Sequence, residues 1–208
     1  MASKKKGKKK PAKAKKKAAP KKAARKAARK DARKAAPKAA PKAAAVPNPW
    51  KAYAANLARE SATTLKVMRA FPADQPNFQP HPRSQSAVVL MSTFTVEQAL
   101  ATMAINGTLR MGGGFPPPYT GISDAIKAFE GAVAGAIATA NSAKPSTYTR
   151  PVEFFTGPGQ VGMVPAGPIA EMMLCDQIHH RGQLSVFIRL AGGKVPSIYG
   201  PSADEPWN

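Results

Sequence analysis

The residues with the clearest chemical potential lie in one short run, Asp176-Gln-Ile-His179-His180-Arg181, which holds two of the three histidines of the chain. Carboxylate and imidazole groups bind divalent metals and transfer protons. Residues four apart share one face of an α-helix, so Asp176 and His180 point the same way, whereas His179 is rotated by about 100°. We therefore expect a site built on Asp176 and His180, with His179 facing solvent or a neighbouring helix.

Four segments with apolar residues at helical spacing must position this site, and Pro- and Gly-rich connections separate them. The third is expected to begin with Ser123-Asp124 as its N-cap. The other three are predicted at about 49–71, 84–107 and 166–191. Helices of this length predict an all-α four-helix bundle over residues 47–208.

The Asp176 run continues into Leu184-Ser-Val-Phe-Ile-Arg-Leu-Ala-Gly-Gly-Lys-Val-Pro-Ser-Ile-Tyr-Gly-Pro-Ser-Ala-Asp-Glu205. Upstream, Leu65-Lys-Val-Met-Arg-Ala-Phe-Pro72 is followed by Phe78-Gln-Pro-His-Pro-Arg-Ser84. Together these stretches resemble the DinB-like (YfiT-type) family, and the resemblance covers about residues 49–205. It implies a four-helix bundle with an up-down-down-up order of helices.

The resemblance also implies a metal, often zinc or nickel, held by one histidine on the second helix and two histidines four apart on the fourth. The fourth-helix pair corresponds to Asp176 and His180, so aspartate replaces one histidine. The second-helix position falls on Ser92 or Thr93, and hydroxyls are poor ligands for zinc or nickel. Glu97 lies about one turn further along and could contribute. By the family pattern, the ligand set is incomplete.

Three interpretations of Asp176 and His180 stay open. The favoured one is a buried hydrogen-bonded pair, the remnant of an ancestral site. The second is a metal site in which water or Glu97 completes the set. The third is metal-free acid–base chemistry by His180, oriented by Asp176.

Charge divides the chain into two parts. Residues 1–46 hold 20 of the 32 Lys and Arg residues and one acid, Asp31, whereas the remainder is nearly neutral. With almost no large apolar side chain, this tail is expected to be disordered, and its composition resembles linker histones. A cationic segment of this kind binds DNA or RNA without reading bases. The predicted nucleic-acid-binding residues are Lys4, Lys5, Lys6, Lys8, Lys9, Lys10, Lys13, Lys15, Lys16, Lys17, Lys21, Lys22, Arg25, Lys26, Arg29, Lys30, Arg33, Lys34, Lys38 and Lys42. A solubilising extension or an anchor on anionic lipids is the alternative.

Two functions compete. The favoured one is a DinB-like bundle with a degenerate metal site that the tail tethers to nucleic acid, with the bundle supplying dimerisation or other partner contacts. The alternative is a metal-dependent enzyme of the thiol-dependent transferase or isomerase type, which the resemblance implies, using Asp176 and His180. The single cysteine, Cys175, excludes an intramolecular disulfide, and no apolar run reaches bilayer length. We therefore expect a cytoplasmic protein without a transmembrane segment, associated with the nucleoid if the tail binds DNA.

Overall fold

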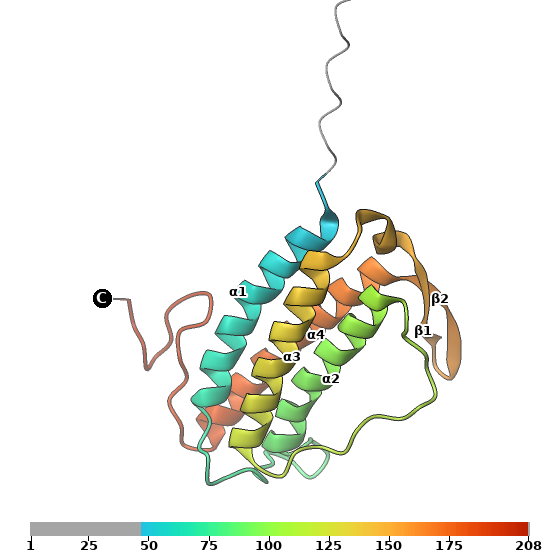
Figure 1. Cartoon of the computed structure of the whole chain (residues 1–208). Helices are drawn as coiled ribbons and strands as arrows, with labels where there is room; N and C mark the ends of the chain where they lie inside the picture. The colour runs from blue at the N-terminus through green and yellow to red at the C-terminus, as the bar shows by residue number, and fades with distance from the viewer. Residues whose placement is uncertain (1–46, 208) are drawn as a thin grey trace, which may run out of the picture. The chain divides into compact units, whose positions relative to one another are not determined.

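The fold is known from a computed structural model, which describes residues 47–207. Its four long helices confirm the predicted bundle (Figure 1). The predicted tail, residues 1–46 with all its candidate nucleic-acid-binding side chains, lies outside the described residues. The helices are α1 (Pro49–Arg69), α2 (Ala87–Asn106), α3 (Ile122–Ser142) and α4 (Ala166–Leu190).

The helices follow the expected up-down-down-up order. In Figure 1, α1 and α4 run in one direction and α2 and α3 in the other. Because α2 and α3 are parallel, residues 107–121 have to carry the chain back along the whole length of the bundle. Each of α1 and α2 packs against both α3 and α4. This arrangement brings α2 alongside α4, which carries the candidate site.

Two helix starts differ from the sequence prediction. α2 begins at Ala87 after the cap residue Ser86, three residues later than expected. α3 begins at Ile122 after Gly121, so the prediction of a Ser123-Asp124 cap is wrong. Asp124 instead lies in the first turn, where its negative charge interacts favourably with the helix dipole.

A β-hairpin that the sequence analysis did not predict precedes α4. Strands β1 (Pro151–Gly157) and β2 (Gln160–Pro165) pair antiparallel, after a short 3-10 helix, η1 (Pro145–Thr149). Val152 and Phe154 on β1 are buried in the bundle core. The hairpin therefore packs onto the end of the bundle where α4 begins.

The apolar core consists of two clusters, one towards each end of the bundle. Between the two clusters, α1, α2 and α4 each place buried polar side chains at mid-length. We call this set the central polar layer. Its members are Glu60, Ser61, Thr64, Glu97, Gln98, Gln177 and Arg181.

α2 is the one helix among residues 47–207 that is long and apolar enough to cross a membrane by length and composition. The core helix of a soluble bundle passes the same test, and α2 packs against α3 and α4.

Candidate metal centre

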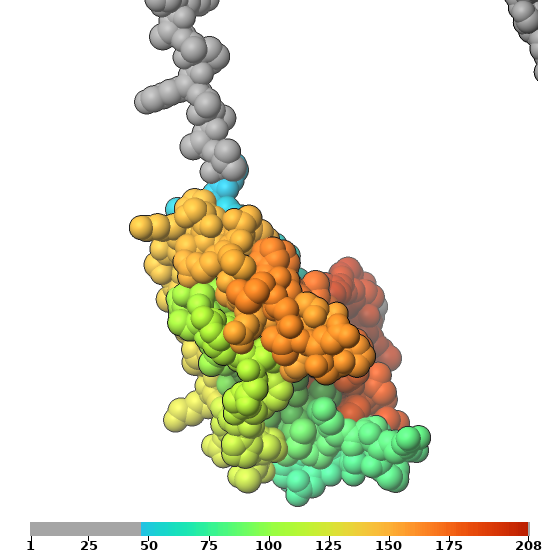
Figure 2. Space-filling model, turned by 90° about the vertical axis from the view of Figure 1, so that its right-hand side faces the viewer, coloured from blue at the N-terminus to red at the C-terminus, as the bar shows by residue number. Residues whose placement is uncertain are grey.

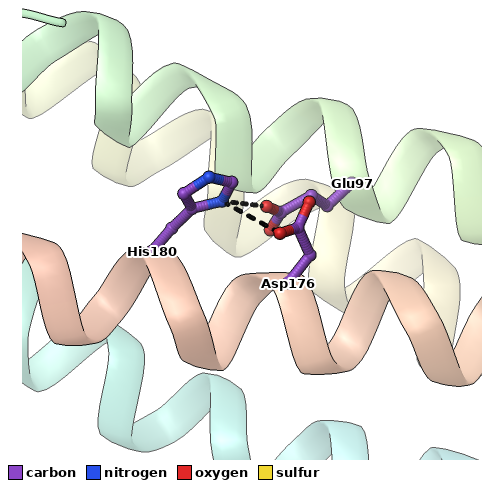
Figure 3. A group of neighbouring side chains, drawn as sticks. All are labelled: Glu97, Asp176 and His180. Carbon is purple, nitrogen blue, oxygen red and sulfur yellow. Dashed lines mark hydrogen bonds and ion pairs between the residues drawn. The ribbon is translucent and has the colours of Figure 1, made fainter. Parts of the chain in front are cut away.

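Glu97 on α2 meets Asp176 and His180 on α4 at one side of the central polar layer. The three side chains point toward one another between the two helices (Figure 3). Nδ1 of His180 lies 2.6 Å from Oε1 of Glu97 and 3.9 Å from Oδ1 of Asp176. One ligand atom from each residue lies within 4.8 Å of the others. The helical spacing of Asp176 and His180 and the packing of α2 on α4 together assemble the group.

Burial and the shared hydrogen bond set the protonation of this group. Only 2% of Glu97 is exposed, and this burial raises its pKa to about 7, although the bond to His180 acts in the opposite direction. The same bond raises the pKa of His180, against the effect of its own desolvation. Both groups therefore favour their protonated forms more than they would in water.

The second carboxylate oxygen of Glu97 is unsatisfied. Oε2 is buried and has no hydrogen-bond partner among residues 47–207. A buried acceptor without a donor is unfavourable, and a cation would satisfy it. The Asp176 and His180 side chains are 43% and 18% exposed, so the group is open to solvent on the α4 side.

The geometry corrects the favoured interpretation of Asp176 and His180 as a buried hydrogen-bonded pair. Their nearest polar atoms are 3.9 Å apart, and Asp176 is partly exposed. Asp176 is free to move away because water can solvate it, whereas the buried Glu97 takes the hydrogen bond of His180.

The other second-helix candidates are occupied elsewhere. Ser92 donates to the carbonyl of Val88 and accepts from the amide of Tyr119, and Thr93 donates to the carbonyl of Val89. Glu97 instead bonds His180 and belongs to the group of three ligand residues.

The residues flanking His180 have structural contacts. His179 is exposed, as predicted, and its Nε2 lies 2.9 Å from the Gln183 amide. Arg181 is fully buried and pairs with Glu60 of α1 at 2.9 Å. Thr64 and Tyr199 complete its surroundings, and we call these four residues the Arg181 network.

The Arg181 network differs from the metal candidate in being satisfied on all sides. Oε2 of Glu60 accepts from Arg181 and, at 2.5 Å, from the hydroxyl of Tyr199. Burial opposes ionisation of Glu60, but these hydrogen bonds hold its pKa below the usual value.

Residues 191–207 pack back over α1 and α4. Arg189 pairs with Asp204, and Lys66 hydrogen-bonds Glu205 at 2.6 Å. Among the described residues, no hydrogen bond links this segment to Glu97, Asp176 or His180. Its position therefore covers the Arg181 network and leaves the open side of the candidate centre free.

Comparison with known proteins agrees with this architecture. A crystal structure of a DinB-like protein from Bacillus cereus ATCC 10987 superposes with a TM-score of 0.60 and 16% identity, over 71% of this chain and 95% of that one. A DinB-like protein of Bacillus subtilis, YjoA, gives a TM-score of 0.55 and 16% identity, over 69% and 94%. The fold is DinB-like.

Sequence comparison places the DinB likeness in the C-terminal quarter of the chain. Residues 162–207 match the DinB family. The uncharacterized protein YrdA of Bacillus subtilis (strain 168) is 45% identical over 42 residues, which span 20% of this chain and 25% of that protein. The segment that matches the DinB family, residues 162–207, contains Asp176 and His180, whereas Glu97 lies outside it.

Proposed function

We propose that this DinB-like bundle binds a divalent first-row metal through Glu97, Asp176 and His180. The observation that carries the proposal is the meeting of three ligand atoms from two helices within 4.8 Å. Ligand–metal distances of about 2.0–2.2 Å require only small side-chain movements from this arrangement.

The donor set fits a cation. Oε2 of Glu97 is a buried acceptor without a donor among residues 47–207, and a metal at this position would satisfy it. Two carboxylates and one imidazole form a harder set than three imidazoles, which shifts the preference from nickel toward manganese and iron while remaining suitable for zinc. Two negative charges also balance a divalent ion, so a buried cation would not be left uncompensated.

Metal analysis of the untagged full chain tests the proposal. After removal of metals with a chelator, we expect one equivalent of Zn²⁺ or Mn²⁺ to bind in calorimetry. Glu97→Gln and His180→Asn should each weaken binding by about 100-fold or more, because each removes a ligand.

His179→Asn is the matched control, since it removes the neighbouring exposed imidazole from the same helix. We expect it to bind metal like the unmodified chain. Equal losses in the His179 and His180 variants, or no stoichiometric binding at all, would contradict the proposal.

A metal-dependent transferase or isomerase acting on a low-molecular-weight thiol is the second candidate. The observation in its favour is the open α4 side of the centre, where Asp176 is 43% exposed. A divalent ion here would supply Lewis acidity, which lowers the pKa of a thiol or of water. A change in the visible spectrum of the Co²⁺-loaded chain on adding glutathione would support this function, and an unchanged spectrum would contradict it.

We propose further that residues 1–46 tether this cytoplasmic protein to nucleic acid and so to the nucleoid. Support comes from the 20 Lys and Arg residues of this segment. Retention on DNA should be strong at low salt and fall steeply with added salt, since each neutralised phosphate releases counterions. Removal of residues 1–46 should abolish retention, and unchanged retention would contradict the tether.

We also propose that the chain forms a homodimer. Light scattering of the full chain should give twice the chain mass of 21.9 kDa. A single species at 21.9 kDa would exclude the dimer.

A further inference from the structure

The outward face of α2 is unusual for a helix at the surface of a bundle. Surface helices normally turn a polar face to solvent. On α2, the residues directed away from the core instead include the apolar Val96, Ala99 and Met103, and Met103 is 44% exposed. This apolar face needs a cover that the four helices do not provide.

Residues 107–121 and the hairpin cover the face only in part, and a cavity of about 660 Å³ remains between them and α2. Phe115 and Tyr119 of the crossing segment and Phe155 of β1 complete its wall. Figure 2 faces this side of the molecule, with residues 107–121 in yellow-green beside the orange hairpin. Phe115 and Phe155 remain 59% and 51% exposed at the cavity. Its volume lies within the range of small-molecule pockets, about 300–1,000 Å³.

The cavity is separate from the candidate metal centre. None of Glu97, Asp176 and His180 lines it. Ala99 and Met103 are rotated from Glu97 around the α2 axis by about 160° and 120°, at 100° per residue. A ligand in this cavity would therefore bind independently of a metal.

Two of the polar side chains in the largely apolar wall, Thr95 and Arg110, have unused hydrogen-bonding capacity. Thr93 and Thr102 of α2 donate their hydroxyls to the carbonyl four residues back, which is usual for threonine in a helix. The Oγ1 atom of Thr95, in contrast, is buried and has no partner among residues 47–207. Thr95 lines the cavity, so a ligand is one source of the missing hydrogen bond.

Arg110 supplies a positive charge at the same cavity. Its side chain is 62% exposed, and the nearest carboxylate oxygen, of Glu153, is 3.7 Å away. That separation is too long for a direct hydrogen bond. A guanidinium has five donor N–H groups, and Arg110 uses Nη1 for the carbonyl of Leu109. Donors remain for an anionic group.

We propose that this cavity binds a small monocarboxylic acid with an apolar body, such as a medium-chain fatty acid. The body lies against Met103, Phe115 and Phe155, and the carboxylate reaches Arg110. This ligand class matches both the apolar residues of the wall and Arg110. Its chain covers exposed apolar surface, and its carboxylate accepts from the remaining guanidinium donors.

Titration of the full chain with decanoate, at concentrations below its self-association, tests the proposal. We expect saturable binding with one equivalent. Ala99→Trp should weaken this binding by at least about tenfold, because the indole fills the cavity. Ala134→Trp is the matched control, since Ala134 is also exposed on a helix but lies on α3, outside the cavity. Butyrate, which has the charge without the apolar body, should not bind measurably, and this arm detects any binding to the basic segment 1–46.

Arg110→Gln tests the carboxylate contact. It should weaken decanoate by about tenfold, or 1.4 kcal/mol, and leave decanol unchanged. Binding that Ala99→Trp does not alter, equal decanoate binding to the Arg110→Gln variant, or absence of saturation would overturn the proposal. A dimer of the full chain that Ala99→Trp dissociates would also overturn it, because a second copy would then cover the cavity.

Discussion

Glu60 and Glu97 are both buried in the central polar layer, and each faces a basic side chain from α4, yet their surroundings differ. One oxygen of Glu60 accepts from both Arg181 and Tyr199, and the other lies 3.5 Å from Arg59. Glu97 has one bond, to His180, and its second oxygen has no partner in the described part of the chain. The pKa of Glu60 is lowered and that of Glu97 is raised.

Residue type therefore does not separate a structural carboxylate from a reactive one, whereas the number of hydrogen-bond partners does. The satisfied Arg181 network fixes the bundle and the segment after α4. The half-satisfied Glu97 retains capacity for a proton or a metal. His180 and Arg181 are neighbours in sequence, so a rotation of about 100° around α4 separates the two roles.

Arg181→Met should have the largest effect on this comparison. It leaves the buried carboxylate of Glu60 without its cation, and breaking a buried pair in this way destabilises by about 3–5 kcal/mol. Urea unfolding of the full chain measures the loss. Arg189→Met, which breaks the exposed pair with Asp204, is the control and should leave the unfolding midpoint close to that of the parent. A similar small shift for both variants would show that the Arg181 network does not hold the bundle together.

The pH dependence of stability should depend on Glu97. The folded-state pKa values of Glu97 and His180 are both raised, so the metal-free folded chain holds protons more tightly than the unfolded chain. Their contribution is therefore present at low pH and is lost as the pH rises through about 7. Between about pH 5 and pH 8 we expect the unfolding free energy of the parent to fall, relative to Glu97→Gln, by on the order of 1–3 kcal/mol.

Glu130→Gln, which removes a carboxylate on the surface of α3, should retain the pH slope of the parent. With saturating metal, the contribution of Glu97 and His180 to the unfolding free energy should instead increase as the pH rises. Metal and protons compete for the same atoms, so metal binding tightens at higher pH. A slope that is the same in the parent and in Glu97→Gln would show that Glu97 does not titrate near neutral pH.

Tyr199→Phe should give the smallest effect. It removes the hydroxyl that donates a hydrogen bond to Glu60 but keeps the ring beside the Arg181 guanidinium. Because Tyr199 is largely exposed and water can replace its hydroxyl, we expect a loss of about 1 kcal/mol in urea unfolding. The metal affinity should stay unchanged. A loss of metal binding in this variant would mean that the two regions are coupled through α4.

The sequence was sufficient for the bundle and for the α4 half of the site. Helical periodicity predicts four helices, and the spacing of Asp176 and His180 places both on one face of α4. The identity of their α2 partner depends on how far α2 is offset along α4, and one turn decides between Thr93 and Glu97. Periodicity within one helix carries no information about that offset, so the prediction left Ser92, Thr93 and Glu97 open.

The hairpin and the Arg181 network are two further features that the sequence analysis did not predict. Residues 151–165 contain the buried alternation of Val152 and Phe154 and a tight turn at Gly157-Pro158-Gly159, where Gly159 has φ 67°. These signals are typical of a β-hairpin, and they do not appear in a pattern of helical spacing. The partner of Arg181, Glu60, lies 121 residues away, so only the fold reveals it.

The central polar layer also locks the helices against sliding along one another. The two apolar clusters on either side of it consist of non-directional contacts, which oppose a shift of one turn, about 5.4 Å, less strongly than hydrogen bonds do. The same shift would move the Arg181 guanidinium away from the Glu60 carboxylate and leave its charge unpaired. Replacing the layer with apolar side chains could therefore yield a stable bundle that no longer has one fixed alignment, and with it the cluster of Glu97, Asp176 and His180 would be lost.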